Sequence, residues 1–284
     1  MTAERLLGKS VESIRTKALA DLAALGRRAK VVAVHNPESP AARYYLRAQK
    51  KVCGEAGVDY EVRTLEPGDG QPRLLAILAE LAADRSVDGI TVHTPLPKGV
   101  DDQAVWRAVA PGKDVEGIHP ENLGRLQIGE HWPAPCAASA AVALARAARP
   151  SMKGLDAVVV GRSALVGKAI AALLLQARGE APTVTICHTA TADLGAHGRR
   201  ADVLFAAAGK AGLIRGSMIK PGAVVIDVGI NEGPDGKVVG DVVFEEAESV
   251  ASVITPVPGG VGPACHYILL RNIAACAARA KGTG

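Results

Sequence analysis

Apolar residues along this chain follow two patterns, helical spacing and short unbroken runs. Residues 2–26 place apolar side chains three to four positions apart, from Leu6 to Leu22, which predicts an amphipathic helix. Beyond it, short apolar runs predict strands at 31–34 and 89–93, and a further strand is predicted at 60–63. Helices are predicted at 41–56 and 73–83. Strands that alternate with helices indicate parallel βαβ units.

The second half of the chain repeats this alternation with more glycine. The predicted strands lie at 157–160, 184–187, 203–206, 224–228 and 253–254. A helix is predicted at 166–176, directly after a glycine-bearing turn. The pattern is typical of a doubly wound nucleotide-binding sheet. A last helix, predicted at 267–280, comes late enough to pack back on the first domain.

Composition narrows the class of protein. Of 284 residues, 48% are hydrophobic and 22% charged, which is enough for a packed core. Aromatic residues make up only 3%, which argues against a platform for stacking bases. The net charge of +4 is spread along the chain, and its densest group, Arg27, Arg28 and Lys30, is typical of a solvated face. We therefore expect no nucleic-acid partner, and a mild positive field that suits an anionic small molecule.

Cysteine usage and hydropathy point to a cytoplasmic protein. The five cysteines are an odd number, and no Cys-x-x-Cys pair occurs, so neither a zinc site nor a disulfide framework is expected. The N-terminus has no apolar run before a cleavage site, and no stretch holds 18 consecutive apolar residues. We expect no metal, no targeting segment and no membrane partner.

The segment VVVGRSALVG, residues 158–167, is a strand, a turn and the start of a helix. Its glycines permit close backbone approach, and a helix N-terminus offers free N–H groups to a phosphate. The usual G-x-G-x-x-G is absent, so a tight turn without ligand remains an alternative. Arg162 favours NADP over NAD, because a guanidinium can bind a 2′-phosphate. Thr189 and its neighbours stand where NAD enzymes often carry an acidic residue, although NAD stays possible.

Residues 254–263, ITPVPGGVGP, form a rigid glycine- and proline-rich segment. Such a loop can cover a cofactor, and it can equally be a crossover between domains. Composition alone leaves both readings open.

Taken together, these segments resemble one family. Besides the two motifs above, they are ADVLFAAAGKAGLIRGSMIKPGAVVIDVGIN, VGDVVF, DGITVHTPLPKGVDD and PGKDVEGIHPENLGRL. The chain resembles the bifunctional methylenetetrahydrofolate dehydrogenase/cyclohydrolase (FolD) family over nearly its whole length. The resemblance implies an α/β fold of two domains: a folate or substrate domain of residues 1–140 plus 265–284, and a Rossmann-type NAD(P)-binding domain of residues 141–264. It also implies a homodimer and a tetrahydrofolate-type substrate.

The resemblance further implies the site residues. The cofactor site is expected to hold Gly161, Arg162, Ser163, Thr189 and Ile230. The substrate site is expected to hold Tyr45, His93, Pro95, Leu96, Glu116, Pro258 and Gly259. Tyr45, Gln49, His93 and Glu116 are the residues expected to act in catalysis.

The substrate half departs from the family pattern. The family's Tyr-x-x-x-Lys reads Tyr45 to Gln49 here, its glutamine before the Pro-Leu-Pro segment is His93, and an aspartate is Glu116. Lys50 and Lys51 follow Gln49, but each residue turns a helix by about 100°, so they should point away.

These departures change the expected chemistry. Hydride transfer from the methylene carbon to a nicotinamide needs proximity and orientation. Hydrolysis of the methenyl product also needs proton transfer, which a lysine of lowered pKa can supply and Gln49 cannot. The sequence therefore predicts a dehydrogenase with weak or absent cyclohydrolase activity. His93 is either a replacement base or a hydrogen-bonding residue, and we favour the second.

Two other functions stay open. So many changes on the substrate side suit a dehydrogenase that acts on a different pterin or one-carbon carrier. Intact cofactor motifs beside an altered substrate side also suit a nucleotide-binding protein without turnover.

Overall fold

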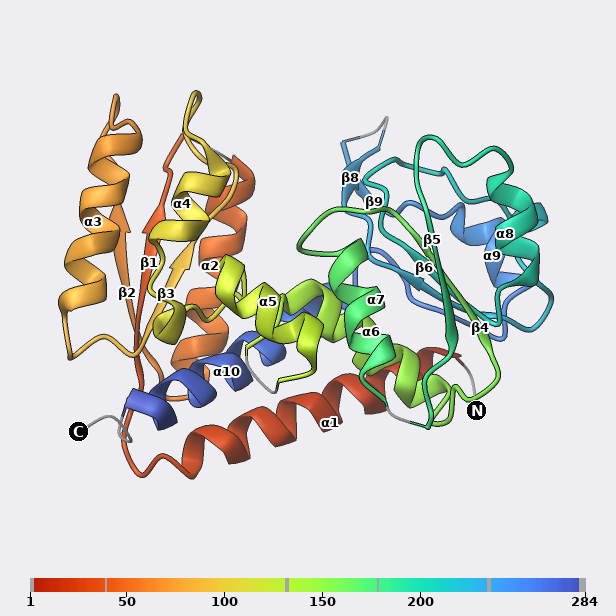
Figure 1. Cartoon of the computed structure of the whole chain (residues 1–284), viewed down its shortest axis with the longest axis horizontal. Coiled ribbons are helices and arrows are strands. Elements are labelled where there is room, and N and C mark those ends of the chain that lie inside the picture. The colour runs from red at the N-terminus through yellow and green to blue at the C-terminus, as the bar shows by residue number, and fades with distance from the viewer. Residues whose placement is uncertain (1–2, 39, 131–132, 178, 234–235, 281–284) are drawn as a thin grey trace. The chain divides into compact units, whose positions relative to one another are not determined.

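The computed structural model describes residues 3–38, 40–130, 133–177, 179–233 and 236–280. The chain divides into two compact units (Figure 1). We call residues 16–134 with 266–284 the first unit, and residues 1–15 with 135–265 the second unit. Helix α1 (Ala3–Ala23) and helix α10 (Val261–Ala280) contribute residues to both. The expected helix over 2–26 begins at a residue outside the described part of the chain.

The first unit is built on a parallel sheet of order β2-β1-β3. Its strands are β1 (Lys30–His35), β2 (Asp59–Thr64) and β3 (Gly89–Val92), within one residue of the predicted bounds. In this register, Val31 lies opposite both Tyr60 and Gly89.

The two faces of this sheet differ because side chains alternate along a strand. Val32, Val34, Ile90 and Val92 share one face and form an apolar cluster with side chains of α3 (Gln71–Ala83) and α4 (Asp102–Ala108). The opposite face carries polar residues toward the carboxyl ends of the strands, and α2 (Pro40–Glu55) packs against β1 and β2. A further helix, α5 (Pro120–Ile128), follows the short 3₁₀ turn η1 (Pro111–Lys113).

The second half of α10 packs within the first unit. Its Asn272 amide donates to the backbone oxygens of Val115 (2.9 Å) and Ala134 (3.1 Å). This confirms the expectation that the last helix packs back on the first domain. The predicted start at residue 267 was wrong, because α10 begins at Val261. Its Pro263 is no obstacle there, since a proline is tolerated in the first turn of a helix.

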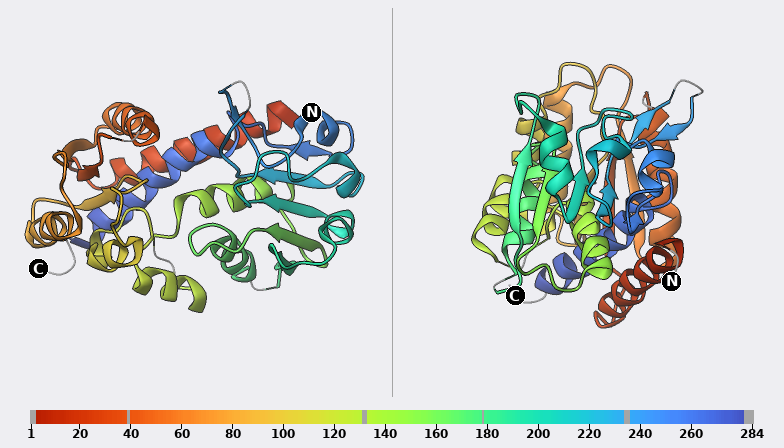
Figure 2. Two further views of the ribbon diagram at one scale, coloured as in Figure 1. Left: turned by 90° about the horizontal axis from the view of Figure 1, so that it is seen from above. Right: turned by 90° about the vertical axis from the view of Figure 1, so that its right-hand side faces the viewer.

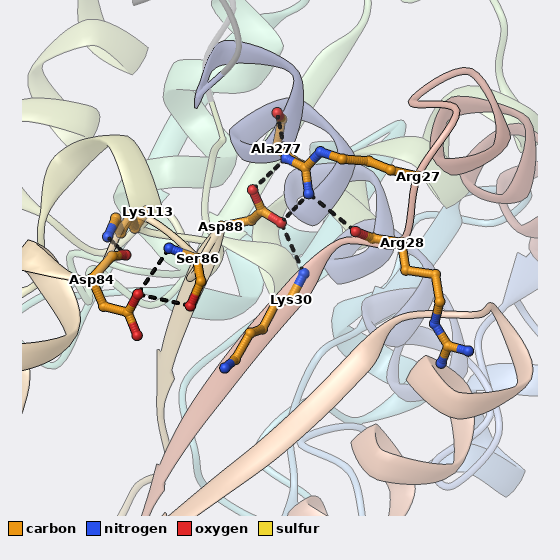
Figure 3. Close-up of polar contacts among 8 residues, drawn as sticks. All are labelled: Arg27, Arg28, Lys30, Asp84, Ser86, Asp88, Lys113 and Ala277. Carbon is orange, nitrogen blue, oxygen red and sulfur yellow. Dashed lines mark hydrogen bonds and ion pairs between the residues drawn. The ribbon is translucent and has the colours of Figure 1, made fainter. Parts of the chain in front are cut away.

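Charged residues gather where the strands of the first sheet begin (Figure 3). Arg27 donates two hydrogen bonds to Asp88, at 2.6 and 2.7 Å, and one to the backbone oxygen of Ala277. The amide of Lys30 donates to the same carboxylate at 2.8 Å. We call Arg27, Lys30, Asp88 and Ala277 the amino-edge cluster. Arg27 is itself exposed, as expected of a solvated face, but its partner Asp88 is only 3% exposed.

The second unit holds a five-stranded parallel sheet of order β10-β7-β6-β4-β5. All five predicted strands are present: β4 (Asp156–Val160), β5 (Thr183–Cys187), β6 (Val203–Ala206), β7 (Val224–Asp227) and β10 (Val253–Ile254). The chain passes from β4 to β5 in one direction and returns beside β4 as β6. The sheet therefore has a switch point between β4 and β6, which confirms the doubly wound fold.

Helices cover both faces of this sheet (Figures 1 and 2). Helices α6 (Cys136–Ala148) and α7 (Gly167–Leu175) pack against each other. Helices α8 (Leu194–Arg200) and α9 (Phe244–Glu248) add to a core built on Val158, Leu204 and Val225. The 3₁₀ turn η2 (Gly216–Met218) and the hairpin of β8 (Asn231–Glu232) and β9 (Val238–Val239) complete the unit. Among the described helices of both units, none has the length and apolar character that a bilayer span requires.

Candidate active site

A buried network of neutral side chains lies in the first unit. The Tyr60 hydroxyl donates to the Gln49 carbonyl oxygen at 2.8 Å. His93 Nε2 lies 3.0 Å from the same oxygen and 3.1 Å from the Tyr60 hydroxyl. The Nδ1 atoms of His93 and His35 are 3.4 Å apart. We call Gln49, Tyr60, His93 and His35 the polar network.

Strand periodicity and helix geometry bring this network together. Tyr60 on β2 and His35 on β1 point to the face of the sheet that α2 covers, and His93 continues that face just past β3. Gln49 lies on the buried side of α2 and is 5% exposed. Lys50 and Lys51 are exposed, whereas Gln49 is buried.

The network is uncharged near neutral pH. Burial, helped by the nearby His35, lowers the pKa of His93 to about 4. Burial and the charge of Arg43 also lower the pKa of His35. Burial raises the pKa of the Tyr60 phenol, which keeps its proton. These side chains therefore exchange hydrogen bonds and hold no charge.

The hydrogen-bond roles follow from what each group can donate. The Gln49 carbonyl oxygen only accepts, so a proton on His93 Nε2 fits its position. His93 Nδ1 then accepts, and His35 Nδ1 must carry the donated proton. This assignment of tautomers rests on the network and agrees with a hydrogen-bonding role for His93.

Glu116 joins the network to the sheet. Its Oε1 accepts from the Thr91 hydroxyl at 2.8 Å and from the Gln49 amide at 3.4 Å. The fully buried Asp114 fixes the turn beyond it, because this carboxylate accepts from the amides of Gly117 (2.9 Å) and His119 (2.8 Å). The structure thus brings Gln49, His93 and Glu116 together, as the sequence led us to expect.

The other substrate-site candidates of the first unit lie around this network. Tyr45 sits one helical turn before Gln49 and is 38% exposed. Its ring centroid is 6.3 Å from that of His266. The backbone oxygen of Pro95 accepts from the Asn36 amide at 3.3 Å. Leu96 packs against the apolar cluster on the opposite face of the sheet, so its side chain contributes to the core.

In the second unit, the turn after β4 packs closely against neighbouring backbone. Gly161 has a φ of +126°, and a Cβ there would lie 2.0 Å from the Ala207 oxygen. A Cβ on Gly167 would lie 2.0 Å from the Gly161 oxygen. The turn therefore approaches its neighbours more closely than any side chain allows, and α7 begins directly behind it.

The predicted cofactor residues gather at one edge of this sheet. Gly161, Arg162 and Ser163 follow β4, Thr189 follows β5, and Ile230 follows β7. The Arg162, Ser163 and Thr189 side chains are exposed, and Ile230 is 59% exposed. This is the carboxyl edge of a doubly wound sheet, where ligands of this fold class bind.

Pro258 and Gly259 belong to the second unit, in the loop after β10. The Gly260 amide donates to the Pro256 oxygen at 2.8 Å, and Gly259 has a φ of +116°. In the described part of the chain, no three His, Cys, Asp or Glu side chains are grouped so as to hold a metal ion.

Sequence reasoning missed Tyr60, His35, Thr91 and, in the second unit, Asp241. Alternation along the three predicted strands was the available signal, because it places Tyr60, His35 and Thr91 on the face that His93 shares. No local pattern marked Asp241, whose partners come from distant segments.

Comparisons with known proteins agree with this architecture. Residues 2–116 match the family described as tetrahydrofolate dehydrogenase/cyclohydrolase, catalytic domain, and residues 135–281 match its NAD(P)-binding domain. The match confirms the expected nicotinamide cofactor. Over 282 residues the chain is 45% identical to the bifunctional protein FolD of Acidiphilium cryptum (strain JF-5), covering 98% of this chain and 100% of that protein.

Two solved structures extend the comparison. The bifunctional FolD methylenetetrahydrofolate dehydrogenase/cyclohydrolase from Campylobacter jejuni is 36% identical with a TM-score of 0.90, covering 96% of this chain and 98% of that chain. The dehydrogenase-cyclohydrolase from Trypanosoma brucei, complexed with NADP and an inhibitor, is 33% identical with a TM-score of 0.86 and covers 95% of each chain.

Proposed function

This chain belongs to the tetrahydrofolate dehydrogenase/cyclohydrolase family, and we propose that it oxidises 5,10-methylenetetrahydrofolate to 5,10-methenyltetrahydrofolate with NADP⁺, with little or no hydrolysis of the product. One observation carries the second half of this proposal. The side chain at position 49 is an amide, and its carbonyl oxygen is held by the neutral Tyr60 and His93.

The choice of NADP is supported by Arg162. Its exposed guanidinium follows Gly161 at the end of β4, where it can bind a 2′-phosphate. Thr189, after β5, leaves no carboxylate at that position to repel such a phosphate. The Trypanosoma brucei relative was solved with NADP.

The oxidation step requires little acid–base catalysis by the protein. The nicotinamide ring, when bound, accepts the hydride, so the protein has to orient the folate and exclude water. Glu116 accepts hydrogen bonds from the Thr91 hydroxyl and the Gln49 amide. We propose that it contacts the amide and amino edge of the pterin, and that Tyr45 stacks on or hydrogen-bonds to the substrate.

Hydrolysis needs a group that exchanges protons near neutral pH. Gln49 has no titratable proton. His93 has a pKa of about 4 and is a weak base at pH 7. The pKa of Tyr60 is raised, so its phenol does not ionise. A missing general base costs about 10²–10⁴-fold in rate, which is the deficit we expect for ring opening.

The test is a paired assay on one purified sample. NADP⁺ reduction with methylenetetrahydrofolate should be readily measured, while loss of the methenyl product should stay close to its uncatalysed rate. Gln49→Lys should raise hydrolysis by about 10²-fold or more, because it returns a titratable amine. Gln49→Leu is the matched control and should leave hydrolysis unchanged. Rapid methenyl hydrolysis by the unaltered protein would contradict the proposal.

A different one-carbon carrier is the second candidate. It is favoured by Glu116, because a glutamate is one methylene longer than the aspartate of the family pattern and would shift a bound pterin ring. A binding screen of tetrahydrofolate against other pterins separates the two substrates. Absence of NADP⁺ reduction with every carrier would instead indicate a binding protein without turnover.

We further propose that the protein acts as a homodimer in the cytoplasm. The family resemblance supports the dimer, and the five cysteines, all free thiols, suit a reducing compartment. Light scattering on the purified protein tests the first statement, and cell fractionation tests the second.

A further inference from the structure

Two buried carboxylates in the second unit have no part in the function described so far. Asp227 ends β7, and Asp241 follows the β8–β9 hairpin. Asp241 is 0% exposed and Asp227 is 3% exposed. Burying charge is costly unless every lone pair finds a donor, so the partners of these groups are informative.

Asp241 accepts hydrogen bonds from three successive backbone amides. Its Oδ2 accepts from Ala208 (2.6 Å) and Gly209 (3.0 Å), and its Oδ1 accepts from Lys210 (2.8 Å). The Asn231 amide donates to Oδ1 as well, at 2.9 Å. The backbone of the loop after β6 is therefore fixed by this buried carboxylate, while residues 208–210 themselves stay exposed.

Asp227 holds Asp241 in place. Its Oδ1 accepts from the amides of Asp241 (3.0 Å) and Gly229 (2.9 Å), and its Oδ2 accepts from Val242 (2.9 Å). Burial and the neighbouring Asp241 raise the pKa of Asp227 to about 6, against the effect of these hydrogen bonds. A Cβ on Gly240 would lie 1.9 Å from Asp227 Oδ2, so only glycine leaves room for the arrangement.

The loop held by Asp241 lies at the switch point of the sheet. It follows β6, and the oxygen of Ala207 lies against Gly161 of the turn after β4, 2.0 Å from where a Cβ would be. Asp227 and Asp241 also bond to Gly229 and Asn231, the two neighbours of Ile230. Asp241 alone bonds to the 208–210 loop and to Asn231, two segments of the edge where the predicted cofactor residues gather.

We propose that Asp241 is a positioning residue for the nicotinamide cofactor. It shapes the 207–210 loop and the 229–231 segment without touching the cofactor itself. The inference rests on the proposed use of NADP for its binding readout, and on the protein alone for its structural readout.

The experiment compares Asp241→Asn with Asp202→Asn in the full chain. Asparagine at 241 replaces one carboxylate oxygen with an N–H₂ group, which leaves two of the four donors without an acceptor. Asp202 is the matched control, because its carboxylate accepts from the Asp156 amide (2.9 Å) and the Lys220 ammonium (2.6 Å) at the opposite edge of the same sheet. Both variants should lose stability, so stability alone does not distinguish them.

Two readouts separate positioning from a general structural role. In cofactor-free protein, amide hydrogen exchange at 208–210 should accelerate about ten-fold in Asp241→Asn and stay unchanged in Asp202→Asn. The Kd for NADP, measured by calorimetry well below the unfolding temperature, should rise about ten-fold only in Asp241→Asn. If Asp241→Asn does not fold, Asn231→Ala removes one of the four donors and should raise the Kd about two- to three-fold.

Unchanged exchange at 208–210, or equal losses of NADP affinity in both aspartate variants, would overturn the inference. If the unaltered protein binds no NADP, the proposed function fails, and the exchange experiment still decides whether Asp241 holds the loop.

Discussion

Two polar regions of the first unit keep their buried side chains hydrogen-bonded in different ways, one with charges and one without. At the amino edge, Arg27 and Asp88 form a charged pair with two hydrogen bonds of 2.6 and 2.7 Å. On the face that α2 covers, Gln49, Tyr60 and His93 form a neutral network, with contacts of 2.8 and 3.0 Å to the Gln49 carbonyl oxygen. The amino-edge cluster joins β1, β3 and α10, so it ties the unit together.

The difference teaches where charge is tolerated. A charged pair is useful where nothing has to react, because its partners are fixed and satisfied. The methenyl product of the proposed reaction is a cation, and a second positive charge beside it would be unfavourable. A neutral network keeps shape and hydrogen bonding without that repulsion.

Breaking the charged pair should have the largest effect on stability. Asp88→Ala leaves the Arg27 guanidinium and the Lys30 amide without their acceptor. We expect the free energy of unfolding to fall by about 3 kcal/mol, the low end for a buried pair because Arg27 is partly exposed. Urea unfolding measures this, and dehydrogenase activity at low temperature should change less than about two-fold.

Arg28→Ala is the control for that substitution. Its partner is Asp59, and both side chains are at least half exposed. The loss should stay below about 1 kcal/mol. Equal losses in the two variants would contradict the distinction between a buried and a solvated ion pair.

Between pH 7 and pH 5 the neutral network should show a pH dependence that the charged pair lacks. His93 has a folded pKa of about 4 and an ordinary value of 6.5, so the unfolded chain binds more protons between these values. Its contribution is present above about pH 6.5 and is lost as the pH falls. Between pH 7 and pH 5 we expect a loss of about 2 kcal/mol that His93→Gln does not show.

The comparison with His93→Gln is needed because Asp227 has the opposite effect. Its raised pKa of about 6 makes the folded protein bind more protons between its ordinary value of 3.8 and about 6, so its contribution falls as the pH rises. For Asp88, burial acts to raise the pKa, but the Arg27 and Lys30 hydrogen bonds outweigh it and place the pKa below 3.8. Its contribution is therefore lost only in stronger acid. If the stability of the unaltered protein and of His93→Gln fell at the same pH, the contrast between the neutral network and the charged pair would be contradicted.

Removing one neutral hydroxyl should have the smallest effect. Tyr60→Phe takes one donor from the Gln49 carbonyl oxygen, while His93 keeps the other. We expect unfolding to become easier by about 1 kcal/mol, since no buried group is left unsatisfied. Thermal unfolding measures it, and the Kd for NADP should not change. A loss as large as that of Asp88→Ala would show that the neutral network contributes as much to stability as the charged pair.

The sequence alone determined the type of fold. All eight strands expected in the two parallel sheets are present, and the fully buried ones, such as β3, β6 and β7, came from short apolar runs. Helices α4, α5, α6, α8 and α9 went unpredicted. Several of these are too short to show a period, and α6 is largely buried with alanine around most of its surface, so apolar spacing carries no information there.

The candidate residues were found where a motif is contiguous. Gly161, Arg162 and Ser163 follow one strand, and Tyr45 and Gln49 lie one turn apart on one helix, so the family resemblance could be read from contiguous sequence. Gln49, an amide where an amine would be expected, is likewise a property of sequence alone. It fixes what the side chain cannot do.

Only the tertiary structure decided which partners these side chains have. Tyr60 reaches Gln49 from β2, and His93 meets both from beyond β3. Asp241 collects amides from a loop more than 30 positions away in the chain. The reason is physical: a hydrogen bond depends on distance and angle in space, and those are set by how strands and helices pack.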